Sequence, residues 1–132
     1  MLYKRLISSI IFSSFLWAIS PALASDIFVA IRSGKMDDLS AAVKKDPSKI
    51  NMPEKNGGAP PLFAAIDSGS TAAVEILLKN GADANIKNKN NYTPLKLAEC
   101  LMNENLKKYA SPKYPATAST IVGILKKHWA RK

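Results

Sequence analysis

The chain has 132 residues, with 19 lysines and arginines against 10 aspartates and glutamates, and a single cysteine. This length accommodates about one domain of the usual ~100–200 residues. One cysteine excludes an intramolecular disulfide, so the fold must be stabilised by packing.

The first 24 residues have the pattern of an export signal. Two basic residues at positions 4 and 5 precede an apolar run over residues 6–19, and the small-x-small sequence Ala-Leu-Ala follows at 22–24. The alternative is a membrane anchor, but a helical span needs about 20 apolar residues. This run has 14 residues, four of them serines. We therefore expect cleavage near Ala24-Ser25, a mature domain over residues 25–132, and a periplasmic or secreted location.

The mature part shows an internal repeat. The sequence IFVAIRSG at 27–34 shares its apolar, alanine and glycine positions with PLFAAIDSG at 61–69, at a spacing of 35. Pro-Leu recurs at 94, a spacing of 33. DDLSAAVKKDPSKIN at 37–51 fills the position of a second helix in the first unit. Self-similarity at such a period indicates stacked pairs of helices.

Residues 57–90 contain the clearest unit. Pro61 suits a first helical turn, Gly69 ends that helix, and Ser70 or Thr71 caps the next. Gly81 follows the second helix, where a left-handed residue is expected. Both helices carry apolar residues at i, i+3 and i+4, the pattern of a buried stripe. These residues are Leu62, Ala65 and Ile66 in the first helix, and Val74, Leu77 and Leu78 in the second.

The third unit contains an insertion. Pro61 and Val74 are 13 residues apart, whereas their counterparts Pro94 and Val122 are 28 apart. The 15 extra residues lie at 103–117, where prolines at 112 and 115 should end any helical extension.

A last helix is expected from about Thr117 to Lys132, as the terminal cap of the stack. Its apolar side would carry Ile121, Val122, Leu125 and Trp129.

These residues resemble the ankyrin repeat family, whose pattern runs G-x-T-P-L-H-x-A-A…G…V…L-L…G-A-D-x-N. The match is strong over 57–90, clear over 91–102, and weak but in register over 26–51. The resemblance implies an all-α repeat solenoid of about three helix-turn-helix repeats with short β-hairpin loops, which acts by binding other proteins. The repeats would cover residues 26–56, 57–90 and 91–132.

The chain departs from this pattern after each Pro-Leu, where the family has histidine. Phe63 and Lys96 stand at those positions, and Pro60 replaces the family's threonine in the second unit. The hydrogen bonds that this histidine and threonine supply are therefore incomplete, and Thr93 is the remaining capping hydroxyl.

The sequence predicts no catalytic, cofactor or metal site, and we expect the protein not to be an enzyme. The one histidine, His128, has no partner from which a triad or a metal site could be built. Cys100, in the middle of a predicted helix, is interpreted as a small buried apolar group.

Candidate partner-binding residues lie in the polar loop before Thr93 and in the insertion, because loops on a rigid scaffold often bind and aromatic side chains favour binding hot spots. The alternatives are a turn kept soluble by asparagine and lysine, and a flexible loop. The candidates are Lys87, Asn88, Lys89, Asn90, Tyr92, Lys107, Lys108, Tyr109, Lys113 and Tyr114.

The basic excess is confined to the last third. Residues 86–132 carry 10 lysines and arginines and two glutamates. We expect a monomer that binds another protein and not nucleic acid, as an immunity factor or a stress-defence accessory protein. The alternative is a protein that binds anionic lipid, glycan or lipopolysaccharide through residues 86–132.

Overall fold

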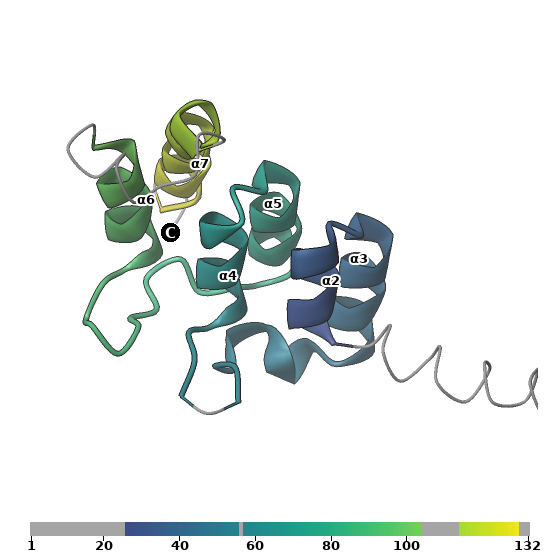
Figure 1. Cartoon of the computed structure of the whole chain (residues 1–132). Helices are drawn as coiled ribbons and strands as arrows, with labels where there is room; N and C mark the ends of the chain where they lie inside the picture. The colour runs from purple at the N-terminus through teal and green to yellow at the C-terminus, as the bar shows by residue number, and fades with distance from the viewer. Residues whose placement is uncertain (1–25, 56, 104–113, 130–132) are drawn as a thin grey trace, which may run out of the picture.

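The computed structural model describes residues 26–55, 57–103 and 114–129 (Figure 1). The predicted export signal and most of the insertion lie outside these residues. Within them the chain forms six α-helices and one 3-10 turn. The elements are α2 (Ile27–Ser33), α3 (Met36–Lys45), η1 (Pro47–Asn51), α4 (Pro61–Asp67), α5 (Thr71–Lys79), α6 (Pro94–Met102) and α7 (Tyr114–Trp129). None of these helices is both long enough and apolar enough to cross a membrane.

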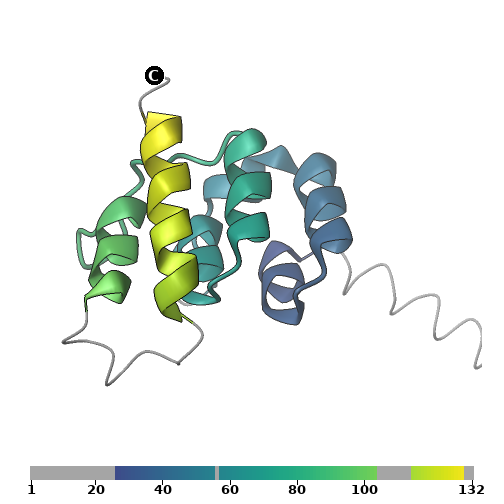
Figure 2. The ribbon, with the colours of Figure 1, turned by 90° about the horizontal axis from the view of Figure 1, so that it is seen from above.

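The helices form three pairs, α2/α3, α4/α5 and α6/α7, stacked in chain order (Figure 2). The first helix of each pair contacts the first helix of the next pair, which gives an inner layer of α2, α4 and α6. The second helices pack likewise into an outer layer of α3, α5 and α7. The segments that begin at Pro61 and Pro94 therefore lie side by side as equivalent helices, as the repeat predicts.

The core runs through the whole stack between the two layers. Both predicted stripes of the second unit are buried, and Val74 and Leu77 have no exposed surface. Neighbouring units contribute the remaining core side chains, including Leu39, Val43, Ile121 and Leu125. Each unit thus buries its apolar side chains against the next unit, as expected of a solenoid.

The predicted helix ends are confirmed. The Ser70 hydroxyl accepts a hydrogen bond from the Ala73 N–H at 3.2 Å, and the Thr93 hydroxyl accepts one from the Lys96 N–H at 3.2 Å. Gly81 follows the end of α5 with φ of +96°, a conformation that would strain a residue with a Cβ.

The loops after η1 and α5 turn as hairpins, but no strand forms among residues 26–55, 57–103 and 114–129. Two backbone hydrogen bonds close the first turn: Glu54 N–H to Ala59 C=O at 3.2 Å and Gly58 N–H to Glu54 C=O at 3.1 Å. The second turn has a similar pattern, with Asn88 N–H to Tyr92 C=O at 3.0 Å and Asn91 N–H to Asn88 C=O at 2.9 Å. These bonds lie within the turns and do not extend into a β-ladder, so the hairpins have turn geometry alone.

The last helix differs from the expectation in two respects. It begins at Tyr114, and Pro115 lies in its first turn, where the missing N–H costs nothing. Pro115 therefore belongs to the start of a helix and does not break one. Trp129, expected on the apolar side, is 61% exposed at the end of α7.

Leu77 offers a test of this packing. Leu77→Ala should lower the free energy of unfolding by about 2–5 kcal/mol, because the lost methyl groups leave a cavity between three units. Urea denaturation followed by circular dichroism measures this change. Ile76→Ala is the matched control, since the half-buried Ile76 should cost less. An unchanged midpoint for Leu77→Ala would contradict the register of the second unit.

Candidate functional site

The inner layer contains a cleft between the first two repeats. It has a volume of about 370 Å³ and lies where α2, the first hairpin and α4 meet. Its lining residues are Arg32, Glu54, Ala59, Ala64, Asp67 and Ser68. Arg32 and Asp67 are 35 residues apart, the spacing of the first two repeats, so equivalent helical positions supply its two opposing charges.

An ion pair forms one wall of this cleft. The Arg32 guanidinium donates to both carboxylate oxygens of Glu54 at 2.7 Å, a bidentate contact between α2 and the first hairpin. The Glu54 hydrogen bond raises the pKa of Arg32, and the Arg32 hydrogen bond lowers the pKa of Glu54. Because both side chains are substantially solvated, the pair orients the hairpin more than it stabilises the fold.

Asp67 supplies the acidic side of the cleft. Asp67 is an exposed residue, and the partial desolvation of its carboxyl group raises its pKa, because removal from water disfavours the charged form. A cationic side chain placed beside Asp67 would favour the ionised form. With two carboxylates and one guanidinium in its lining, the cleft favours a basic side chain over an acidic one.

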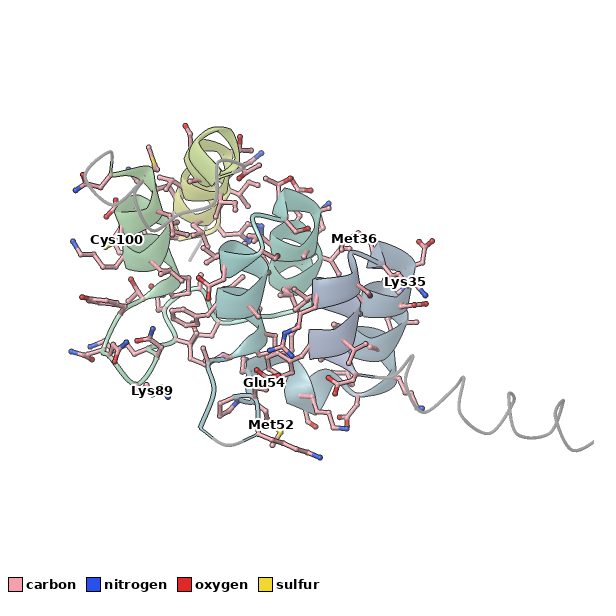
Figure 3. All side chains as sticks on the ribbon, in the orientation of Figure 1. Lys35, Met36, Met52, Glu54, Lys89 and Cys100 are labelled. Atoms are coloured by element: carbon pink, nitrogen blue, oxygen red, sulfur yellow. The ribbon has the colours of Figure 1, made fainter. Side chains whose placement is uncertain are left out.

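The second hairpin holds five of the predicted contact residues. The side-chain Oδ1 of Asn88 accepts the backbone N–H groups of Asn90 and Tyr92, each at 3.0 Å. The amide of Asn88 thus shapes the turn and is partly buried. Lys87, Lys89, Asn90 and Tyr92 are exposed, and Figure 3 shows Lys89 at the hairpin tip.

The other five predicted residues come from the insertion. Lys107, Lys108, Tyr109 and Lys113 lie outside the described residues, and Tyr114 begins α7. The structure therefore brings together the hairpin residues and leaves the insertion residues as predictions.

Sequence reasoning did not identify the cleft residues. The repeat alignment places Arg32 and Asp67 at equivalent positions, and this signal could have identified both. Glu54 lies in the first hairpin, and no local sequence pattern indicates that this hairpin packs against α2.

The described residues hold no group of three or more histidine, cysteine or acidic side chains that could bind a metal. Cys100 on α6 is partly exposed, in contrast to the buried position expected for it (Figure 3). His128 is partly buried near the end of α7.

Comparison with known proteins identifies the repeat. The family described as "Ankyrin repeats (3 copies)" matches residues 27–109. A human protein named oxysterol-binding protein-related protein 1 is 36% identical to the chain over 74 residues. This region is 55% of the chain and 8% of the human protein, so the chain spans under a tenth of that relative's length. Because the family matches most of the chain and the helices stack as three equivalent pairs, the chain belongs to the ankyrin repeat family.

Proposed function

We propose that this protein is a non-enzymatic protein-binding module, exported to the bacterial periplasm, that holds its partner across the inner layer and the hairpin tips. Ankyrin repeats are generally protein-binding modules. The observation that carries the proposal is the cleft of Arg32, Glu54 and Asp67, which opens between two inner helices beside the first hairpin. Both hairpins project on the same side of the stack (Figure 1).

The chemistry of this surface favours a protein ligand. The cleft, at about 370 Å³, has room for a side chain or two and offers a guanidinium and two carboxylates to orient them. The second hairpin adds Tyr92, which is 43% exposed and follows the lysines and asparagines of residues 87–91. An exposed aromatic side chain on a rigid turn is a suitable anchor for a binding hot spot. An immunity factor or an accessory protein of stress defence would use such a surface to hold another protein.

Site-specific photo-crosslinking tests this proposal. A photoreactive amino acid replaces Ala64 in the cleft, Tyr92 on the second hairpin, or the exposed Ala72 on the outer layer. Irradiation of cells should give a crosslinked partner from positions 64 and 92 and none from position 72. The adducts are resolved by gel electrophoresis and identified by mass spectrometry. Equal crosslinking from Ala72 would show that the inner layer has no special role.

Export is tested separately. The basic start, the apolar run over residues 6–19 and the Ala-Leu-Ala sequence support a cleaved signal. Expression in a bacterial host should give a periplasmic protein whose amino-terminal sequence begins at Ser25. A full-length chain retained in the membrane fraction would contradict cleavage and favour the anchor reading.

The basic C-terminal third supports a second candidate, binding to an anionic envelope surface. Residues 84–103 and 114–129 carry five lysines against Glu99 alone. Such binding should fall steeply between low salt and ~0.15 M ionic strength, where exposed charges are screened beyond ~8 Å.

A charge-reversal pair separates this candidate from the first. In a vesicle co-sedimentation assay, Lys126→Glu with Lys127→Glu should abolish binding to anionic vesicles. Lys44→Glu with Lys45→Glu, in the last turn of α3, makes the same charge change at the other end of the stack and is the control. Equal losses from both pairs would exclude a localised anionic-surface site.

A further inference from the structure

The C-terminal end of the stack holds a second concave site, which we name the terminal pocket. It has a volume of about 200 Å³ and lies between the second hairpin, the start of α6 and the end of α7. Its walls are mainly apolar, with an asparagine and a threonine as polar groups. The lining residues are Ala84, Asn85, Thr93, Leu95, Leu125 and Trp129.

The preceding repeat has an equivalent place in the stack, and there the next segment of the chain covers it. Asn51 and Asn85 are equivalent residues of their repeats. Asn51 stands three residues before Glu54, and Asn85 stands three residues before Asn88, and the N–H groups of Glu54 and Asn88 close the two hairpins. Ile50, Pro60 and Leu62 are the counterparts of Ala84, Thr93 and Leu95. The first three are buried, whereas the second three are partly exposed.

The segment that follows α5 fills the earlier position. Ala82 is buried to 7% exposure, and the Asp83 N–H donates to the side-chain oxygen of Asn51 at 2.8 Å. The Asp83 carboxylate accepts the Asn85 N–H at 2.9 Å, which holds the segment in its turn. A small side chain followed by aspartate is therefore the ligand that this type of pocket binds within the protein itself.

Among the described residues of the third repeat, which extend to Trp129, no equivalent turn follows Leu125. Trp129 stands four residues after Leu125, as Gly81 stands four after Leu77. Gly81 turns the chain with φ of +96°, which tryptophan adopts only with strain. The helix instead continues through Trp129, whose side chain lines the terminal pocket and is 61% exposed.

The positive charge at this end of the stack favours an acidic ligand in the terminal pocket. The described residues of this end, 84–103 and 114–129, carry Lys87, Lys89, Lys96, Lys126 and Lys127. Glu99 is the one acidic residue among them, and its carboxylate lies 4.0 Å from the Lys126 amine. Asp83 directly precedes this range, and its carboxylate accepts the Asn85 N–H, so five lysines stand against two acidic residues. A net positive end attracts an acidic segment and repels the same end of a second copy.

Building on the proposed function, we propose that the terminal pocket binds an extended acidic segment of the partner protein. A small apolar residue of that segment would take the place that Ala82 has in the preceding repeat, with the next backbone N–H donated to Asn85. An aspartate at that next position would face the lysines. The partner would thus complete the stack as a following repeat does.

Nuclear magnetic resonance titration of the full chain tests this site. The probe is the capped pentapeptide Gly-Ala-Asp-Ala-Asn, the sequence of residues 81–85, and the matched control peptide is Gly-Ala-Lys-Ala-Asn. The aspartate peptide should shift the Trp129 indole signal and the Asn85 side-chain amide, with an affinity several-fold above that of the lysine peptide. Trp129→Phe should remove this indole signal, which assigns it.

Two variants sharpen the result. Asn85→Ala should weaken the aspartate peptide by about five-fold, the effect of one lost hydrogen bond. Ser48→Ala, which removes an exposed polar group in the first repeat, should leave the affinity unchanged. Shifts confined to Arg32 and Asp67 would overturn the terminal pocket and leave the proposed function standing. Shifts of Trp129 with protein concentration, in the absence of peptide, would show that a second copy covers the pocket and would also overturn the proposal.

Discussion

Each helical pair of this protein has apolar side chains on the surface that faces a neighbouring pair, and only that neighbour can cover them. Leu77 is fully buried because the first and third pairs lie on either side of the second. In a stack whose units contact only the units next to them, the loss of one interface exposes two pairs at once. Stability is therefore a property of the interfaces, and no single pair has a core of its own. This is why three repeats are close to the minimum that folds independently.

Polar contacts set how the hairpins sit on this apolar stack. Asn51 accepts the Asp83 N–H across the boundary between two repeats, and Arg32 holds Glu54 against the end of α2. The two contacts differ in how much they contribute to the stability of the fold. A main-chain N–H in a partly buried turn must find an acceptor, whereas the exposed ion pair contributes little energy and mainly fixes direction. Together they place both hairpins beside the inner layer, and the cleft is the space that results.

The parts of the fold that follow from local chemistry could be predicted from the sequence. Proline at a first turn, hydroxyl caps at Ser70 and Thr93, and glycine at position 81 each satisfy a demand of the backbone within a few residues. The exposure of Trp129 could not be predicted in this way, because its apolar character and its helical spacing match a buried stripe. What decides its position is the continuation of α7 through Trp129, which leaves the side chain at the rim of the terminal pocket. The cleft was missed for a related reason: Arg32 and Glu54 meet through the fold of a hairpin, and no pattern in the sequence encodes that contact.

The two concave sites also differ in the charge that they favour. The cleft between the first two repeats places the acidic Asp67, with its raised pKa, opposite an arginine already paired with Glu54, and these two carboxylates and one guanidinium give the cleft a negative balance that favours a basic side chain. The residues that line the terminal pocket are uncharged, and the described residues 83–103 and 114–129 carry five lysines against Asp83 and Glu99. A partner that reached both sites would be favoured in one direction along the stack, with a basic group at the first repeats and an acidic group at the last. The reverse direction would place like charges together at both ends, which costs binding energy and slows association. The lopsided charge of the chain would then determine the orientation of the partner as well as the strength of its attraction.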